Sequence, residues 1–414
     1  MKAVVFSLGC KVNECESNAL ISGLKQMGYE VDDKLVFADL YILNTCAVTK
    51  EAEKKSRQLA SRVKKLNPNA KVIFCGCATQ KEPKAFSSKN PNFLVTGVFN
   101  KNKILQMLLE CGEKLSPESK VYEEMLPVTT LRTRSFFKVQ DGCNNFCSYC
   151  IIPYLRGRSR SRNPQSVVDE INLSNPIEAV INGINLSSYN YEGTDLTGLI
   201  TKLWQVDARI RLGSLEVRVI TPEFLKSLSG LKNFAPHFHL SLQAGSDAVL
   251  KSMNRRYTRQ EFIEKVDLIR DYFPDAGITT DIIAGFPTET EKDFEDTLSL
   301  VDRVKFSDIH PFIFSPREGT VAYKMKDLDH AVKKSRLDKL IEKKHALKEQ
   351  FALKMQGKVL EFLPEEKQGE WTVGYSENYL RLYVKGDLSQ KSLVKVVVDR
   401  PYEDGAIATV IKEK

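Results

Sequence analysis

The sequence lacks any long hydrophobic run and any recognisable export signal. No stretch approaches the roughly 20 consecutive apolar residues of a membrane-spanning helix. Residues 1–6 have neither the apolar region nor the cleavage site of a signal peptide. These absences argue against a membrane protein and predict the cytoplasm as the compartment.

The densest group of cysteines lacks a fourth cysteine or a histidine close to it in sequence. Cys143, Cys147 and Cys150 have the spacing CxxxCxxC, no fourth cysteine follows nearby, and the nearest histidine is His237. Structural zinc normally needs four protein ligands, and a disulfide framework suits short secreted chains better than 414 residues with nine cysteines. Thiolates are typical ligands of iron–sulfur clusters. Three of them would leave one iron of a cubane open to bind a small molecule.

The composition is that of a globular protein with a basic excess. Of 414 residues, 42% are hydrophobic and 28% charged, and the formal net charge is +8. Residues 1–112 hold 17 Lys and Arg against 10 Asp and Glu. The length allows two or three domains. The charge is a weak indication of an anionic partner such as nucleic acid.

The first 112 residues alternate short apolar runs with helical patterns, which is typical of a doubly wound parallel sheet. Strands are predicted at 4–6, 40–43, 72–74 and 93–95, and helices at 17–27, 50–66, 82–87 and 101–110. In such sheets, ligands bind beyond the carboxyl ends of the strands.

Three cysteines follow the first three of these strands. Because Cys10, Cys46 and Cys77 lie at equivalent strand ends, they can converge on one point and hold a second cluster through three thiolates. The alternative is three unrelated buried thiols, since free cysteine is common in protein cores. Cys75 is the main competitor of Cys77, because it is only two residues away.

After a connector with two prolines, residues 129–357 repeat strand and helix about six times. Strands are predicted at 136–140, 178–182, 211–215, 238–242, 279–284 and 309–314, with helices between them and a long Lys-rich helix at 331–356. Six units can form an open sheet or a partial barrel. The CxxxCxxC loop follows the first strand, at the carboxyl end where such folds place their chemistry.

Residues 358–414 change to short strand-like stretches and predict a small β-barrel of a kind that often binds nucleic acid. Aromatic and basic side chains interleave along it, which suits base stacking and phosphate contact. They are Trp371, Tyr375, Tyr379, Tyr383, Arg381 and Lys385. The alternative is that the aromatic side chains form the core of the barrel.

Two cysteine triads followed by a small barrel resemble the radical S-adenosylmethionine (SAM) methylthiotransferases over essentially the whole chain. The matching segments are SLGCKVN (7–13), NTCAV (44–48), GCATQ (76–80), CNNFCSYC (143–150), NGINL (182–186), HLSLQ (239–243), GSD (245–247), MNR (253–255) and GFP (285–287). The resemblance implies an α/β fold with a doubly wound domain at 1–112, a six-unit radical SAM partial barrel at 129–357 and a TRAM-like RNA-binding barrel at 358–414. It also favours Cys77 over Cys75.

Members of this family replace a C–H bond with C–S–CH₃, using SAM and two [4Fe-4S] clusters. The implied ligands of the SAM-cleaving cluster are Cys143, Cys147 and Cys150. Those of the auxiliary cluster, which holds or delivers sulfur, are Cys10, Cys46 and Cys77. The resemblance also implies an electron donor such as flavodoxin or ferredoxin, and a sulfur donor.

Three branches of the family differ in substrate. Two modify the adenosine beside the tRNA anticodon, which carries an isopentenyl or a threonylcarbamoyl group, and the third modifies an aspartate of a ribosomal protein. Segments 9–14, 44–49, 183–186 and 213–216 resemble the threonylcarbamoyladenosine branch most, which implies the 2-methylthio derivative of that nucleoside at position 37 as product. Val217, Ala244 and Thr288 depart from the family pattern, none of them at a cysteine.

Further side chains are predicted to contact SAM. They are Tyr149, Gly183, Asn185, Ser241, Gln243 and Arg255. Tyr149 precedes the third cysteine, and in the superfamily the aromatic residue at this position borders the adenine of SAM. Arg255 can pair with the SAM carboxylate or with RNA phosphate. The alternative is that these residues serve only the fold.

A band of arginines flanks the cluster loop and indicates phosphate contact with a tRNA anticodon stem-loop. Its members are Arg132, Arg134, Arg156, Arg158, Arg160 and Arg162. The alternative is a solvated loop. If the protein is not an enzyme, the remaining hypothesis is that it is a redox sensor that binds RNA and carries iron–sulfur clusters.

Overall fold

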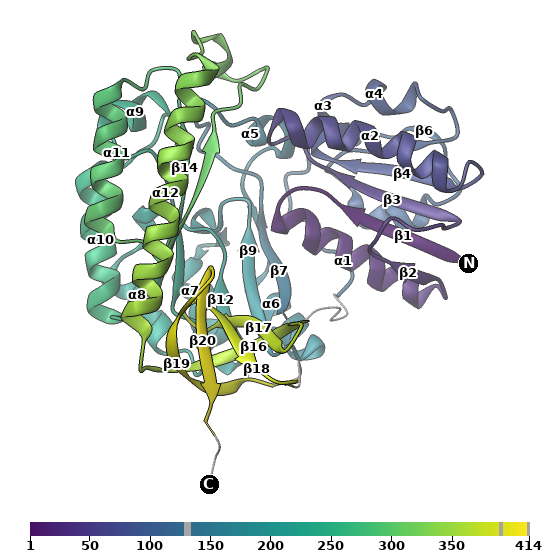
Figure 1. Cartoon of the computed structure of the whole chain (residues 1–414). Coiled ribbons are helices and arrows are strands. Elements are labelled where there is room, and N and C mark those ends of the chain that lie inside the picture. Colours follow the sequence, from purple (N-terminus) through teal and green to yellow (C-terminus); the bar gives the residue numbers. More distant parts are fainter. Residues whose placement is uncertain (128–133, 389–391, 412–414) are drawn as a thin grey trace.

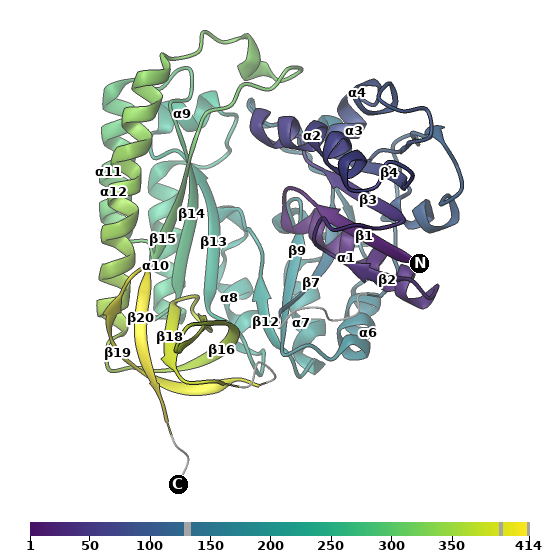
Figure 2. The same cartoon turned by 45° about the vertical axis from the view of Figure 1, so that its right-hand side comes forward.

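The computed structural model describes residues 1–127, 134–388 and 392–411. The chain forms an N-terminal α/β lobe, a central α/β core and a small β-barrel at one end of the core (Figures 1 and 2). This is the predicted three-part α/β architecture, which is thereby confirmed. Within the described ranges, no helix is long and apolar enough to cross a membrane.

The N-terminal lobe is built on a parallel sheet with the strand order β2-β1-β3-β4-β5-β6. The strands are β1 (Lys2–Ser7), β2 (Glu30–Asp32), β3 (Leu40–Thr45), β4 (Lys71–Gly76), β5 (Leu94–Val95) and β6 (Gly112–Glu113). Side chains of successive strand residues point to opposite faces, so each face carries its own apolar core. One face is covered by α1 (Lys11–Gln26) and the 3₁₀ helix η1 (Lys101–Gln106). The other is covered by α2 (Lys50–Leu66), α3 (Cys77–Lys81) and α4 (Lys84–Ser87).

The core contains six parallel strands arranged as two sheets, with the orders β12-β9-β7-β8 and β13-β14-β15. They are β7 (Arg134–Asp141), β9 (Glu178–Gly183), β12 (Arg209–Leu212), β13 (His237–Gln243), β14 (Gly277–Ala284) and β15 (Asp308–Ile313), with β8 (Arg160–Ser161) antiparallel to β7. Among the described residues, the two sheets are joined through isolated bridges, such as that between Leu215 and Leu240, and not through a continuous ladder. The six units therefore form an open, partial barrel.

Seven helices pack on the outside of these strands. They are α6 (Pro164–Ser174), α7 (Leu196–Lys202), α8 (Pro222–Ser229), α9 (Asp247–Ser252), α10 (Arg259–Tyr272), α11 (Glu291–Val304) and α12 (His330–Met355). The short α5 (Ile152–Arg156) packs instead against the N-terminal lobe, where Leu155 joins the core beneath α2 and α3. Local sequence explains where several begin: Asn163 caps α6 ahead of Pro164, and Thr258 and Thr290 open capping boxes at α10 and α11.

The C-terminal strands close into a barrel in the order β16-β17-β18-β20-β19. They are β16 (Val359–Gln368), β17 (Trp371–Ser376), β18 (Arg381–Lys385), β19 (Val394–Tyr402) and β20 (Gly405–Val410). The barrel docks on the core at Glu178, the first residue of β9, a fully buried carboxylate that pairs with Arg134, Arg209 and Arg211. These arginines also bind the barrel, for example through Glu365. The barrel therefore sits at the amino ends of the core strands, opposite to the end that carries the CxxxCxxC loop.

Candidate iron–sulfur and S-adenosylmethionine site

The CxxxCxxC loop connects β7 to α5, at the carboxyl end of the first core strand. The thiol of Cys143 accepts hydrogen bonds from the Asn145 backbone N–H (3.5 Å) and from Asn185 Nδ2 (3.8 Å). Cys147 accepts one from Arg255 at 3.4 Å. Burial raises the pKa of the Cys150 thiol to about 12, helped by its two neighbouring cysteines. The loop thus gathers three thiols among N–H donors that suit a negatively charged sulfur.

The second triad lies where three strands of the N-terminal lobe end. Cys10 follows β1 and caps α1, Cys46 follows β3, and Cys77 follows β4 and begins α3. Burial, together with the neighbouring Cys77 and Cys10, raises the pKa of the Cys46 thiol to about 11. Helix N-termini favour negative charge, so two of the three positions are suited to thiolates. The helix expected at 17–27 begins earlier, at Lys11, and this places Cys10 at its start.

Two glycines make the approach of these loops possible. Gly9 has a φ of +106°, and a Cβ there would lie 2.7 Å from the Cys46 sulfur. Gly76 has a φ of +104°, and a Cβ there would lie 2.4 Å from the backbone oxygen of Thr45. An alanine at either position would force the cysteine loops apart.

Cys75 lies apart from this triad. It is buried in β4 and packs in the core beneath α1, whereas Cys77 belongs to the core on the opposite face of the sheet. The strand ends at Gly76, whose φ of +104° turns the chain, so Cys77 leaves the strand direction while Cys75 keeps its packing position in the core. That Cys77 and not Cys75 is the ligand stays a prediction.

The residues present fit two clusters better than single metal ions. Across residues 1–127, 134–388 and 392–411, no three His, Cys, Asp or Glu side chains surround one point as ligands of one ion would. A cubane does not require that, because each of its three thiolates binds a different iron. Each triad offers three cysteines, so one iron of each cluster would stay open for a further ligand.

Arg255 occupies the centre of the candidate SAM site. Its guanidinium donates to the backbone oxygen of Ser241 (3.0 Å) and lies near the hydroxyl of Tyr257 (3.2 Å), the sulfur of Cys147 and the carboxylate of Glu216. The Glu216 carboxylate also accepts a hydrogen bond from Asn145 in the cluster loop. Arg255 and Glu216 thus place one cation and one carboxylate beside the loop, the two charges that a zwitterionic amino acid group requires.

The other predicted SAM contacts lie around the same end of the core. Asn185 donates its backbone N–H to Gln140 Oε1 (2.8 Å), and a Cβ on Gly183 would lie 2.9 Å from the Gln140 side chain. Ser241 and Gln243 are the half-buried positions of β13, on the face opposite to its core residues. Tyr149 packs at the edge of the core. Burial and the neighbouring Cys147 raise the pKa of its hydroxyl, and Arg255 opposes this rise. Glu216 was missed as a site residue, although its segment, GSLE (213–216), follows the third strand.

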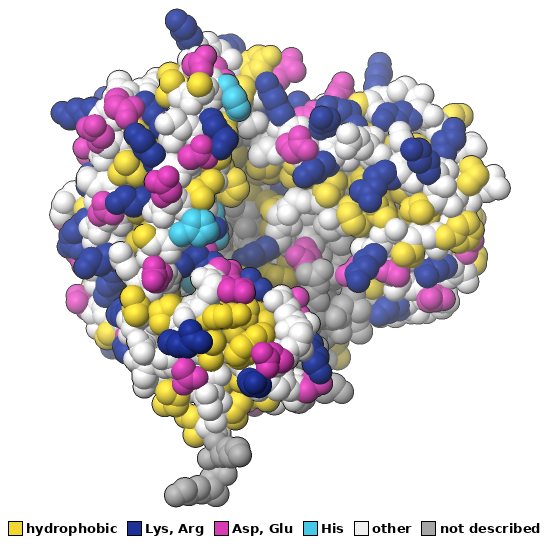
Figure 3. Space-filling model, viewed as in Figure 1, with side chains coloured by type: hydrophobic (Ala, Val, Ile, Leu, Met, Phe, Trp, Pro, Cys, Tyr) yellow, Lys and Arg dark blue, Asp and Glu magenta, His cyan; other side chains and the backbone are white. Residues whose placement is uncertain are grey.

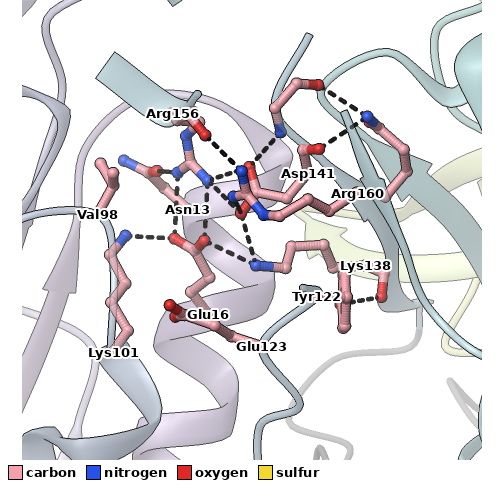
Figure 4. Close-up of polar contacts among 12 residues, drawn as sticks. Asn13, Glu16, Val98, Lys101, Tyr122, Glu123, Lys138, Asp141, Arg156 and Arg160 are labelled. Carbon is pink, nitrogen blue, oxygen red and sulfur yellow. Dashed lines mark hydrogen bonds and ion pairs between the residues drawn. The ribbon is translucent and has the colours of Figure 1, made fainter. Parts of the chain in front are cut away.

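A buried ionic network joins α1 and η1 of the N-terminal lobe to β7 and α5 of the core (Figure 4). We call it the interlobe network; its members are Asn13, Glu16, Lys101, Lys138, Asp141 and Arg156. Arg156 donates to both oxygens of Glu16, to Asp141 (3.0 Å) and to Asn13 (2.6 Å). Lys138 bonds Glu16 and Asp141, both at 3.0 Å, and Lys101 also pairs with Glu16.

The interlobe network reaches residues adjacent to both triads. Asp141 precedes Cys143 by two residues, and Asn13 follows Cys10 by three. Burial raises the pKa of the Cys77 thiol, and the charge of Arg156 opposes this rise. One arginine of the core thus acts electrostatically on a candidate ligand of the other lobe.

The predicted arginine band is therefore wrong as a phosphate-binding surface. Arg156, Arg160 and Arg162 are buried and engaged within the protein, and Arg134 lies in the barrel interface. Arg158 is exposed, over the ring of Phe146, and Arg132 lies outside the described residues. The alternative, in which these arginines lie in a solvated loop, is also wrong for Arg156, Arg160 and Arg162, because their side chains are buried.

The barrel aromatics are likewise mostly engaged inside the molecule. Tyr379 stacks between His237 and Tyr375, with Arg134 and Arg211 over its ring. On another part of the barrel, the hydroxyl of Tyr383 donates to Asp404 and Arg381 pairs with the same carboxylate. Trp371 packs on Tyr402, and the exposed Lys385 pairs with Glu370. The interleaved pattern thus builds the interface with the core and contacts within the barrel, and RNA contact by the barrel stays a prediction.

Known proteins resemble both halves of this site. A family described as the Radical SAM superfamily matches residues 137–301, and one described as Uncharacterized protein family UPF0004 matches residues 2–97. The threonylcarbamoyladenosine tRNA methylthiotransferase MtaB of Bacillus subtilis (strain 168) is 35% identical, over 100% of this chain and 98% of that protein. The tRNA-2-methylthio-N(6)-dimethylallyladenosine synthase of Thermoanaerobacter sp. (strain X514) is 36% identical, over 86% and 80%.

Solved structures agree on the fold. The radical S-adenosylmethionine methyltransferase TsrM from Kitasatospora setae superposes with a TM-score of 0.53 at 12% identity, covering 75% of this chain and 74% of that one.

The MtaB of Aquifex aeolicus (strain VF5) is a further relative, 36% identical over 96% of this chain and 100% of its own length. The resemblance in sequence spans both cysteine triads and the barrel, and the chain belongs to the radical SAM methylthiotransferase family, a family of sulfur-inserting transferases that use SAM and two [4Fe-4S] clusters.

Proposed function

We propose that this protein converts N6-threonylcarbamoyladenosine at position 37 of tRNA to its 2-methylthio derivative. The observation that carries the proposal is the pair of thiol triads, one at strand ends of the N-terminal lobe and one in the loop after β7, in a chain alignable over its full length with a threonylcarbamoyladenosine tRNA methylthiotransferase. When bound, the clusters and SAM would supply hydrogen abstraction, sulfur and a methyl group. The chain's own residues hold these groups and exclude water.

The proposed ligands are assigned by position. Cys143, Cys147 and Cys150 hold the SAM-cleaving cluster and act as the catalytic set. Cys10, Cys46 and Cys77 hold the auxiliary cluster. Around SAM, Arg255 faces the carboxylate and Glu216 the ammonium, and Tyr149, Gly183, Asn185, Ser241 and Gln243 line the remainder of the site.

A cation beside the auxiliary triad supports the threonylcarbamoyl branch. Lys11 follows Cys10 and is exposed at the start of α1. Burial lowers the pKa of His237, and Lys11 is among the cations that lower it further. Burial would raise the pKa of Asp281, but nearby cations, with Lys11 among them, lower it. A threonylcarbamoyl group ends in a carboxylate, whereas an isopentenyl group is uncharged. Lys11 would therefore favour the first substrate over the second.

The proposal extends to partners and compartment. The substrate is the anticodon stem-loop of tRNA, so the cytoplasm is the proposed compartment. An electron donor such as flavodoxin or ferredoxin would reduce the SAM-cleaving cluster, and a sulfur donor would recharge the auxiliary one.

The test is nucleoside mass spectrometry after anaerobic reaction of the reconstituted protein with SAM, a reductant and RNA stem-loops. The expected product is the methylthio form of threonylcarbamoyladenosine, with 5′-deoxyadenosine as co-product. A product only from isopentenyladenosine, or a methylthio group only on a ribosomal-protein aspartate, would move the protein to another branch. Clusters without any 5′-deoxyadenosine would identify the redox sensor instead.

A further inference from the structure

Two helices of this protein are rich in lysine, and they differ in what surrounds those lysines. Along α12, carboxylates from the helix itself and from neighbouring elements neutralise the lysines. Lys334 pairs with Asp338 of the same helix, Lys343 with Asp302 of α11 at 2.6 Å, and Lys344 with Asp308 at 3.6 Å. The cations of α12 are thus used within the fold.

The second helix, α2, presents its cations to solvent. Leu59, Ala60 and Val63 pack on the sheet of the N-terminal lobe, and the opposite side of the helix forms what we call the α2 basic face. Its exposed members are Lys50, Lys54, Lys55, Arg62, Lys64 and Lys65. Figure 3 shows Lys and Arg side chains gathered over this lobe, where α2 lies in Figure 1.

The α2 basic face is almost free of carboxylates. Throughout the part of the chain that the structure describes, the one ion pair within 4 Å that its six cations make is between Lys55 and Glu51, at 3.9 Å on the same helix. Surface pairs of this kind contribute little. Glu53 does not neutralise the face either, because it is buried beneath the helix against Arg317 and Lys81.

The position of α2 connects this charge to the candidate active site. The helix starts four residues after Cys46, and its Ser56 hydroxyl hydrogen-bonds both the backbone N–H (3.0 Å) and the backbone oxygen (3.1 Å) of that cysteine. At its first residue, the backbone N–H of Lys50 donates to Ser315 of the core. The helix therefore starts where the two lobes meet and extends about 25 Å from there, at 1.5 Å per residue.

We propose that the α2 basic face binds the phosphate backbone of the RNA substrate, close to the entrance of the cleft between the lobes. The inference rests on the proposed function. Unpaired, exposed lysines in a row are suited to phosphates, which they contact without reading sequence. Of the arginines that sequence spacing assigned to this role, Arg156, Arg160 and Arg162 are buried, whereas α2 presents several exposed cations beside the auxiliary triad.

The test compares two triple variants that remove the same charge from two helices. Lys54→Gln/Lys64→Gln/Lys65→Gln alters the α2 basic face, and Lys334→Gln/Lys339→Gln/Lys343→Gln alters α12. Binding of the reconstituted proteins to a tRNA is measured against salt concentration. The α2 variant is expected to bind at least about tenfold more weakly and to lower the slope of log K against log salt by about two to three. The α12 variant should match the wild type.

Activity separates this inference from the proposed function. At saturating tRNA, the α2 variant should keep its rate of product formation and its iron content, with a raised KM. If the α2 and α12 variants lose the same affinity, or neither loses any, the α2 basic face is not the RNA site. If the wild type shows no salt-dependent tRNA binding at all, the proposed function fails as well.

Discussion

The guanidinium of Arg156 donates to both carboxylate oxygens of Glu16, at 3.0 and 3.2 Å, although the two residues lie in different lobes and 140 positions apart. Both side chains are completely buried. Burying such a pair costs desolvation energy that is offset only when the charges are well surrounded by partners. Here Lys101, Lys138 and Asp141 provide them, so the interlobe network fixes how the two cysteine loops face each other.

Replacing Glu16 by Gln should destabilise the protein by about 3 kcal/mol, because it leaves buried cations without their counter-charge. Denaturant unfolding of the reconstituted protein measures the change. Asp267→Asn is the matched control: its ion pair with Arg303 is exposed, and its loss should cost less than about 1 kcal/mol. Equal effects of the two substitutions would show that the interlobe network adds no stability.

The same carboxylate predicts sensitivity to acid. Burial alone would raise the pKa of Glu16, but Arg156, Lys101 and Lys138 outweigh burial and hold that pKa well below its usual range. A group whose pKa is lower in the folded state stabilises the fold fully above its unfolded pKa of about 4.3, and loses that contribution as the pH falls. Unfolding at pH 7 and at pH 4 should therefore differ more in the wild type than in Glu16→Gln.

Iron analysis distinguishes the two neighbouring cysteines of β4. Cys77→Ala should lose the auxiliary cluster, so that iron falls from about eight to about four atoms per chain. Cys75→Ala should keep all the iron and lose only packing, because its side chain lies in the core beneath α1. Retention of about eight irons in Cys77→Ala would remove that residue from the ligand set.

Arg255 should contribute to SAM affinity and not to cluster assembly. Arg255→Met removes a charged donor to the SAM carboxylate, worth about 1.5–3 kcal/mol, and should weaken SAM binding at least about tenfold with iron unchanged. Equilibrium dialysis with labelled SAM measures the affinity. The exposed neighbour Arg256, changed to Met, is the control. If Arg255→Met binds SAM as tightly as the wild type does, Arg255 does not pair with the SAM carboxylate.

The docking of the barrel depends on one carboxylate. Glu178→Gln leaves Arg134, Arg209 and Arg211 without their shared anion in a buried interface, which should cost about 3 kcal/mol or more. Hydrogen exchange should rise at residues 375–379, where Tyr375 and Tyr379 lie under these arginines. Unchanged protection there would mean that the aromatic stack alone holds the barrel.

The sequence was sufficient for features that depend on local patterns. Alternating apolar runs located all six core strands, and cysteines placed just after apolar runs were correctly expected at the ends of three N-terminal strands, because the end of a strand is marked by local sequence. The helix start after Asn163 follows from local sequence for the same reason. The cysteines could therefore be placed at strand ends before any tertiary contact was known, while their role as cluster ligands stays a prediction.

What could not be predicted depends on pairing between distant residues. Arg156 looked like a surface cation because charged residues are usually exposed, and nothing near it in sequence indicates Glu16. The lysines of α2 and α12 look alike for a similar reason: several of the carboxylates that neutralise α12, such as Asp302 and Asp308, come from other elements of the core. Sequence spacing gives the charge of a helix, whereas its counter-charges come from the fold.

The interlobe network has a consequence for how a nucleotide could reach the cleft. Buried ion pairs among Glu16, Asp141 and Arg156 join the lobes, so moving the walls of the hollow that Figure 3 shows between them would break charge pairs that are shielded from water. Under the proposed function, we therefore expect the target base to leave its stack and enter this hollow, in place of the lobes closing around an RNA helix. That extrusion costs least for an unpaired base in a loop, which favours single-stranded adenosines as substrates.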